Sequence, residues 1–187
     1  MTGDPKRVAV LVSGRGSNLK ALIDKASGYE VALVASNRPQ APALDLARAA
    51  GLPTWTFEGR DTPREEFDAL LTNCLVDHQI GTIALAGYMR LLSARFVDRW
   101  RGRIVNIHPS LLPKFKGLQP HERALAAGES ITGCTVHVVT EEVDSGEILA
   151  QVEVAIEAGD DVAELSKRVL MAEHALYPAT LAVFVRR

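Results

Sequence analysis

Short, continuous apolar runs recur along the chain, separated by segments whose apolar residues follow helical spacing. Val8–Val12, Val31–Ala35 and Thr82–Gly87 are the clearest of these runs. Such runs are typical of strands buried on both faces of a parallel sheet. Between the first two, the apolar positions from Leu19 to Ala26 predict an amphipathic helix. The alternation predicts an α/β fold, with a doubly wound, mostly parallel, Rossmann-like sheet.

Proline, glycine and hydroxyl residues mark the expected ends of the other elements. A helix is predicted over Pro42–Ala50 and a strand over Pro53–Phe57. Thr62 is the expected N-cap of the following helix, with Pro63 as its first helical residue. Ser93 is expected to cap a further short helix. Residues 114–120 show little regular pattern and predict a loop.

The pattern changes towards the C-terminus. Thr135–Thr140 and Ile148–Val154 are rich in β-branched residues, and a turn at Asp144–Gly146 separates them. These two strands are predicted to add to one edge of the sheet as an antiparallel pair. A last long helix is expected to follow a cap at Asp160 and Asp161, with Pro178 interrupting or kinking it.

The candidate chemistry lies in Ile104–Pro113, an apolar strand that carries two functional side chains. Asn106 and His108 are two positions apart, so they project from the same face of the strand. Pro109 ends the strand directly after His108. In open α/β sheets, ligands bind at the carboxyl ends of the strands. A hydrogen-bond donor and a proton carrier are therefore expected at a ligand-binding edge, although a capped strand end with a surface histidine gives the same pattern.

A glycine-rich turn follows the first strand, at Ser13-Gly14-Arg15-Gly16-Ser17-Asn18. Backbone N–H groups at the start of the next helix suit a phosphate group. A dinucleotide site is the alternative, but Leu19 stands where that motif needs a third small residue. No acidic residue follows Val31–Ala35 to bind a ribose diol, although Arg38 leaves a 2′-phosphorylated cofactor open. A monophosphate cradle is the favoured interpretation.

Composition narrows the class of protein. The 187 residues suit one domain with a sizeable core, and the net charge of −2 gives no sign of nucleic-acid binding. Cys74 and Cys134 are too few for a disulfide framework, and the five histidines show no metal-ligand spacing. The apolar run after the polar N-terminus is too short for a signal peptide or a membrane span. A cytoplasmic protein without a metal or a membrane partner is expected.

Four motifs in this order and spacing resemble the phosphoribosylglycinamide formyltransferase family, the folate-dependent enzymes of purine biosynthesis. They are Ser13–Leu19, Gly87–Leu92, Asn106–Pro113 and Thr140–Gly146. The resemblance extends from Arg7 to Pro178 and implies a single formyltransferase domain over residues 1–187. It places phosphate binding in about residues 1–100, and catalysis and folate binding in about residues 101–187. The Gly-Ser-Asn loop is the most specific of the motifs.

Residue by residue, the resemblance implies a catalytic trio of Asn106, His108 and Asp144. Substrate binding is implied for Gly16, Ser17, Asn18 and Glu173, and folate binding for Arg64, Met89, Arg90, Leu91, Leu92, Thr140, Glu141, Glu142 and Val143. Leu170 departs from the family, in which that position is often polar and contacts the ribonucleotide.

The implied reaction transfers a formyl group from 10-formyltetrahydrofolate to the amine of glycinamide ribonucleotide, without a metal. The carboxamide of Asn106 and a protonated His108 suit the developing oxyanion, and Asp144 would orient the imidazole. A formyltetrahydrofolate hydrolase and a noncatalytic nucleotide-binding module are the alternatives. Only small molecules are expected as ligands, and the protein is expected to be a monomer or a homodimer.

Overall fold

The computed structural model describes residues 3–57 and 62–187, so Met1 and Thr2 of the polar N-terminus lie outside it. Within these residues a seven-stranded sheet has the order β3-β2-β1-β4-β5-β6-β7. The strands are β1 (Asp4–Val12), β2 (Glu30–Ser36), β3 (Thr54–Thr56), β4 (Ile80–Leu85), β5 (Ile104–His108), β6 (Ile131–Val138) and β7 (Ile148–Ala155). The helices are α1 (Ser17–Asp24), α2 (Pro42–Ala49), α3 (Arg64–Asp77), α4 (Ala94–Arg99), α5 (Pro120–Ala126) and α6 (Val162–Phe184).

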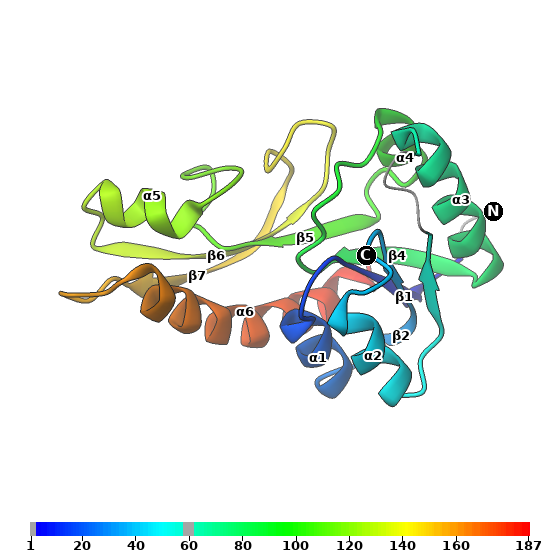
Figure 1. The fold of residues 1–187 in the computed structure, drawn as a ribbon, viewed down its shortest axis with the longest axis horizontal. Coiled ribbons are helices and arrows are strands. Elements are labelled where there is room, and N and C mark those ends of the chain that lie inside the picture. The colour runs from blue at the N-terminus through cyan, green and yellow to red at the C-terminus, as the bar shows by residue number, and fades with distance from the viewer. Residues whose placement is uncertain (1–2, 58–61) are drawn as a thin grey trace.

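The first five strands in space, from β3 to β5, are parallel, and β6 and β7 continue the sheet as antiparallel neighbours. The prediction of a mostly parallel sheet with an antiparallel addition is thus confirmed. Figure 1 shows α1, α2 and α6 on one side of the parallel strands, and α3 and α4 on the other. The sheet is therefore doubly wound.

Successive side chains of β1 point to opposite faces of the sheet, so this strand contributes to the two apolar clusters that lie on the two faces. Val8, Val10 and Val12 pack into the apolar cluster formed with α1, α2 and α6. Ala9 and Leu11 face the opposite cluster, which includes Phe67 and Leu75 of α3 and Trp100 after α4. All five of these β1 side chains are fully buried, as expected for a central strand that helices cover on both faces.

Two predicted helix boundaries are absent from the structure, the N-cap at Thr62 and the interruption at Pro178, and a tertiary hydrogen bond lies at each position. Thr62 is not an N-cap: α3 begins at Arg64 with Pro63 as the cap residue, and the Thr62 carbonyl accepts a hydrogen bond from Arg90. Pro178 does not interrupt α6, which continues to Phe184. Proline cannot donate to the carbonyl four residues earlier, that of His174, but Lys25 Nζ donates to this oxygen at 3.0 Å. A residue from the end of α1 thus replaces the missing helical donor.

Candidate active site

The site lies at the carboxyl ends of β1, β4 and β5, where the strand order reverses. From β1 the chain proceeds outward to β2 and β3, whereas β4 lies on the other side of β1 and leads to β5. Such a topological switch point opens a crevice between the two central strands. Ser13, after β1, bridges the crevice: its hydroxyl accepts from the Met89 backbone N–H at 2.7 Å and donates to Asn37 Oδ1 at 2.5 Å.

Asp144 approaches His108 from a distant turn, as the resemblance implied. Its Oδ2 lies 3.3 Å from His108 Nδ1 and accepts from the Gly117 N–H at 2.9 Å. Its other oxygen lies 3.4 Å from His137 Nε2. Asp144 has a φ of 49°, a left-handed conformation that aspartate tolerates better than most side chains. One carboxylate therefore contacts two imidazoles and the 114–120 loop.

The electrostatic balance at Asp144 favours its charged form. Burial raises the pKa of this carboxyl group, but the hydrogen bonds from His137 and Gly117 and the charges of His108 and His137 outweigh it. The pKa of Asp144 is therefore lowered overall. Asp144 is ionised at neutral pH, and it can stabilise positive charge on either neighbouring imidazole.

His137 belongs to this candidate site by its contacts, and the sequence analysis did not include it. The antiparallel register pairs Asn106 directly with His137, so both side chains lie on one face of the sheet. His137 Nδ1 contacts the carbonyl oxygen of Val138 at 3.0 Å, and Nε2 lies 3.2 Å from Asn106 Nδ2. In the sequence, His137 stands within a β-branched run that predicts a strand. This position indicates that His137 lies beside Asn106 only once the register of the strand pair is known.

His108 is 6% exposed, and both its ring nitrogens face oxygen atoms. Nδ1 faces Asp144, and Nε2 lies 3.0 Å from the carbonyl oxygen of Phe115. Only an imidazolium has an N–H at both positions. The 114–120 loop therefore covers the imidazole. The carbonyl oxygen of Phe115, in this loop, is the hydrogen-bond partner of Nε2, the ring nitrogen that points away from Asp144.

The start of α1 has the features of an anion-binding site. Gly16, the N-cap residue, has a φ of 84°, and a side chain there would collide with Ala43. No side chain of the described residues caps this helix end, so the N–H groups of its first turn are left without side-chain acceptors. Only β4 separates β1 from β5, so these two strands are two strand spacings, or about 10 Å, apart, and this turn and His108 lie at the same edge of the sheet.

Glu173 of α6 joins this region. Asn18 Nδ2 donates to Glu173 Oε2 at 2.7 Å, and burial raises the pKa of the Glu173 carboxyl group despite this bond. Asn18 Oδ1 is buried and has no hydrogen-bond partner among the described residues. Leu170, one turn earlier on α6, is half-buried and offers no polar group. The predicted substrate residues Asn18 and Glu173 are thus in contact.

A second group of predicted residues surrounds a cleft beside the trio. Its walls include Arg90, Leu91, Leu92 and residues 140–144, and it reaches Asn106 and His137. A neighbouring depression, which shares Arg90 and Leu91, is lined by Arg64 and Met89. All the residues expected to bind folate therefore border two adjoining hollows, one with an apolar wall of Leu85, Leu92 and Val97.

The described residues contain no metal-binding group, no disulfide and no membrane-spanning helix. No group of three or more His, Cys, Asp or Glu side chains within residues 3–57 and 62–187 has an arrangement that could hold a metal ion. Cys74 and Cys134 are free and buried. In the same part of the chain, no helix has the length and apolar character needed to cross a membrane.

The doubly wound sheet carries Asn106, His108 and Asp144 together at the edge where its strand order reverses. Comparison with known protein families shows which class of protein has this arrangement. The chain belongs to the formyl transferase family, whose profile matches residues 6–181.

Within this family, the chain is similar to proteins of purine biosynthesis. It is 41% identical to phosphoribosylglycinamide formyltransferase of Escherichia coli, over 95% of this chain and 86% of that one. It is 48% identical to the human trifunctional purine biosynthetic protein adenosine-3, over 94% of this chain. This chain spans only 18% of that relative's length. The crystal structure of phosphoribosylglycinamide formyltransferase from Brucella melitensis matches with a TM-score of 0.91 and 45% identity, covering 100% of this chain and 97% of that one.

Proposed function

We propose that the protein transfers the formyl group of 10-formyltetrahydrofolate to the amine of glycinamide ribonucleotide. The name of the Escherichia coli relative supports glycinamide ribonucleotide as the formyl acceptor. The motifs of the formyl transferase family support 10-formyltetrahydrofolate as the donor. The observation that carries the proposal is the position of the Asp144 carboxylate, between two imidazoles and beside the Asn106 carboxamide. In this proposal both halves of the domain build the same active site, and the N-terminal half contributes the phosphate-binding turn.

Glycinamide ribonucleotide would bind across the crevice, from α1 to the trio. Its phosphate accepts from the backbone N–H groups of Gly16, Ser17 and Asn18, where the helix dipole favours negative charge. The ribose and glycinamide contact Glu173 and the unpartnered Oδ1 of Asn18. The rim distance of about 10 Å between β1 and β5 suits a molecule with a phosphate at one end and an amine at the other.

The folate would occupy the two adjoining hollows. The pterin ring lies in the cleft bounded by Leu92 and residues 140–144, close to Asn106 and Asp144. The aminobenzoyl group passes Met89 and Leu91, and the glutamate reaches Arg64 and Arg90. This placement brings the formyl group to the face of the sheet that carries the trio.

The amine nitrogen attacks the formyl carbon, and a C–N bond forms while negative charge develops on the formyl oxygen. Asn106 and protonated His108 donate to this oxygen, and Asp144 holds the imidazolium in position. The bond between the formyl carbon and the folate nitrogen then breaks. The folate nitrogen gains one proton and the amine nitrogen loses one, so the protons balance. A metal is not needed, because direct attack on the formyl carbon requires no Lewis acid.

The 114–120 loop bears on this reaction because the Phe115 carbonyl contacts His108 Nε2. For this nitrogen to donate to the formyl oxygen, the substrate oxygen has to replace the Phe115 carbonyl. Exchange of one acceptor for another keeps the imidazolium fully hydrogen-bonded throughout. Substrate binding therefore breaks the hydrogen bond between the Phe115 carbonyl and His108 Nε2, and this part of the loop has to move away from the imidazole.

An assay of the purified protein tests the proposal. The protein is mixed with 10-formyltetrahydrofolate and glycinamide ribonucleotide, and the release of tetrahydrofolate and the formation of formylated ribonucleotide are followed. Equal yields of the two products are expected, with no formate when the ribonucleotide is omitted. Formate released at the same rate without an amine acceptor would instead indicate a formyltetrahydrofolate hydrolase.

A further inference from the structure

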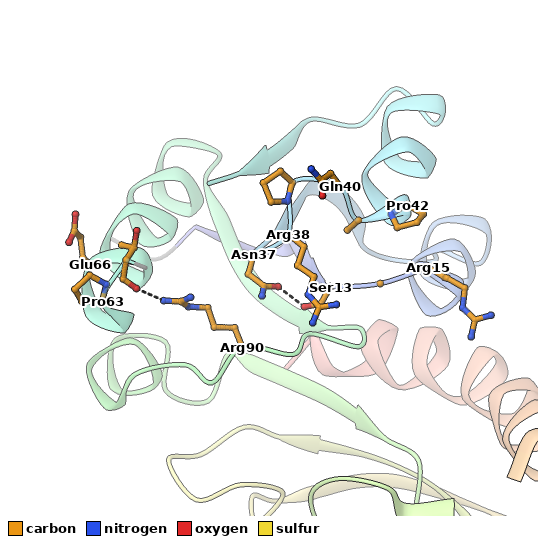
Figure 2. A pocket seen from close by; sticks show the side chains of 13 residues that line it. Ser13, Arg15, Asn37, Arg38, Gln40, Pro42, Pro63, Glu66 and Arg90 are labelled. Atoms are coloured by element: carbon orange, nitrogen blue, oxygen red, sulfur yellow. Dashed lines mark hydrogen bonds between the residues drawn. The ribbon is translucent and has the colours of Figure 1, made fainter. Parts of the chain in front are cut away.

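Two buried hydroxyl groups hold chain segments together at the edge of the sheet that carries the site. Figure 2 shows the first, that of Ser13, hydrogen-bonded to Asn37 in a cleft at the ends of β1 and β2. The second belongs to Thr135 of β6, which is the direct partner of His108 in the antiparallel pair of β5 and β6. Thr135 has no part in the mechanism above, although it lies beside the imidazole that the mechanism uses.

The Thr135 hydroxyl is fully hydrogen-bonded. It donates to the Ser110 carbonyl oxygen at 2.6 Å. It accepts from the Leu112 N–H at 3.0 Å and from Gln151 Nε2 at 2.9 Å. A hydroxyl group has one proton and two lone pairs, so these three bonds use its whole capacity. The hydroxyl therefore fixes the chain at the second and fourth residues after His108.

Gln151 of β7 extends this arrangement to the last strand of the sheet. It is the direct partner of Thr135 in the pair of β6 and β7, so the side chains of His108, Thr135 and Gln151 form a row on one face. The Gln151 amide nitrogen also donates to the Leu112 carbonyl oxygen at 2.9 Å. Both backbone groups of Leu112 are thus held, the N–H by Thr135 and the carbonyl by Gln151.

Side-chain packing holds the same segment against β6. The Leu111 side chain lies over Gly133, where an added Cβ would be only 2.7 Å from Leu111 Cδ2. The Ser110 hydroxyl donates to the Lys114 carbonyl oxygen at 2.6 Å and closes the segment on itself. Residues 110–114 are therefore fixed on β6 and β7 by hydrogen bonds and by close packing.

This segment connects His108 to the loop that contacts its ring. The segment follows the end of β5 at His108, and Phe115, whose carbonyl lies 3.0 Å from His108 Nε2, comes directly after it. A shift of residues 110–114 over β6 and β7 would move both the imidazole and the group that faces it. Gln151 does not line the two folate hollows, so its effect on the reaction passes through this segment.

We propose that Gln151 is a positioning residue for His108, acting through Thr135 and Leu112. The inference rests on the proposed function, because it assigns Gln151 a role through a donor to the developing oxyanion. Such a donor has to be held in place before the reaction, since a small displacement lowers the rate. The alternative is that the bonds of Gln151 stabilise the fold and leave the imidazole unaffected.

Steady-state kinetics of formyl transfer test the proposal, at a temperature at which circular dichroism shows every variant folded. Gln151→Leu removes both hydrogen bonds and is expected to lower kcat by about three- to tenfold. The KM values of both substrates should change by less than about twofold, because the imidazole acts mainly in the transition state. Gln151→Glu has nearly the shape of glutamine, but its carboxylate cannot donate at neutral pH, so it should show the same loss. Gln151→Lys keeps a donor and should retain most of the kcat.

A double-mutant cycle with His108→Ala separates positioning from a purely structural role. If Gln151 acts through the imidazole, Gln151→Leu has little further effect on kcat once His108 is alanine, and the two losses are not additive. A purely structural role predicts the same loss in both backgrounds. Additive losses would therefore overturn the inference, as would an unchanged kcat in Gln151→Leu and Gln151→Glu.

Glu153→Leu is the matched control, since Glu153 is an exposed residue of β7, two positions from Gln151 and on the same face. It should change neither kcat nor the KM values. Absence of formyl transfer by the wild-type protein would contradict the proposed function itself. A normal kcat of the Gln151 variants in an active enzyme contradicts only the role of Gln151.

Discussion

Asn18 Nδ2 lies 2.7 Å from Oε2 of Glu173, so a hydrogen bond ties the first turn of α1 to the middle of α6. The two residues are 155 positions apart in the sequence. The bond leaves a largely buried carboxylate oxygen and the unpartnered Oδ1 of Asn18 beside the N–H groups of α1. A phosphate site and a pair of acceptors for hydroxyl or amine donors therefore form one surface.

Glu173→Gln is expected to weaken use of glycinamide ribonucleotide and to stabilise the fold. Loss of a charged acceptor lowers kcat/KM for the ribonucleotide by about ten- to a hundredfold. Burial raises the pKa of Glu173, so the wild-type protein loses stability as the pH rises above 4.5, the ordinary value. The variant should therefore have a higher Tm than the wild type at pH 8, and the difference should disappear near pH 4.

Glu153→Gln is the control for both measurements, because Glu153 is an exposed residue of β7. It should change neither kcat/KM nor the pH dependence of Tm. A Glu173→Gln variant with normal kinetics would remove Glu173 from the substrate site, even if it were more stable.

Asn106→Ala and His108→Ala each remove one donor to the proposed oxyanion. Loss of one such donor raises the barrier by roughly 3–4 kcal/mol, about a hundred- to a thousandfold in kcat. The KM values should change little, since the donors act mainly in the transition state. Steady-state kinetics measure both parameters, with His78→Ala at the end of α3 as the control. Retention of kcat within about tenfold would contradict the assignment.

Asp144→Asn tests the carboxylate that contacts both imidazoles. It replaces charged hydrogen bonds with neutral ones and should lower kcat by about ten- to a hundredfold, or 1.5–3 kcal/mol. Burial raises the pKa of Asp144, but its donors and the two imidazoles lower it overall, below 3.8. The stabilisation is therefore complete above pH 3.8 and is lost as the pH falls through the lower folded-state pKa.

Urea unfolding at several pH values checks this stability difference. Wild type should exceed Asp144→Asn in free energy of unfolding at pH 6, and the two should converge in strong acid. Asp24→Asn is the control, since the ion pair of Asp24 with Lys20 is exposed and adds little. A difference between wild type and Asp144→Asn that persists at pH 2 would show that Asp144 acts by packing rather than by charge.

Local patterns were sufficient to predict much of the fold. Continuous apolar runs identified β1, β2 and β4, and β-branched runs identified the antiparallel pair β6 and β7. Period-two alternation placed Asn106 and His108 on one face, and the caps at Ser93 and Asp161 are confirmed, because these features depend on neighbours in sequence.

Features that depend on distant residues could not be derived from spacing. Asp144 reaches His108 because β6 pairs with β5, and only that register brings His137 opposite Asn106. Pro178 was expected to interrupt or kink its helix, because Lys25, which replaces the missing donor, lies at the end of a different helix. The resemblance to a family implied the role of Asp144, but it did not identify His137 or Gln151.

Tyr177→Phe tests how α6 positions the substrate site. The buried Tyr177 hydroxyl lies 3.0 Å from the carbonyl oxygen of Leu85, the last residue of β4, and 3.1 Å from that of Val105, near the start of β5. Its loss should lower the free energy of unfolding by about 1–3 kcal/mol, since two buried carbonyls lose their shared donor. Glu173 precedes Tyr177 by one helical turn, so KM for glycinamide ribonucleotide should also rise.

The control for this variant is Tyr29→Phe, because the buried Tyr29 hydroxyl donates to a single carbonyl, that of Leu22, at 2.9 Å. Urea unfolding should show a smaller loss for Tyr29→Phe, about 0.5–1.5 kcal/mol, with KM unchanged. Equal losses of stability with normal KM values in both variants would mean that Tyr177 only fills the core. A raised KM in Tyr177→Phe alone would show that the bonds to β4 and β5 align α6, and with it Glu173, against the start of α1.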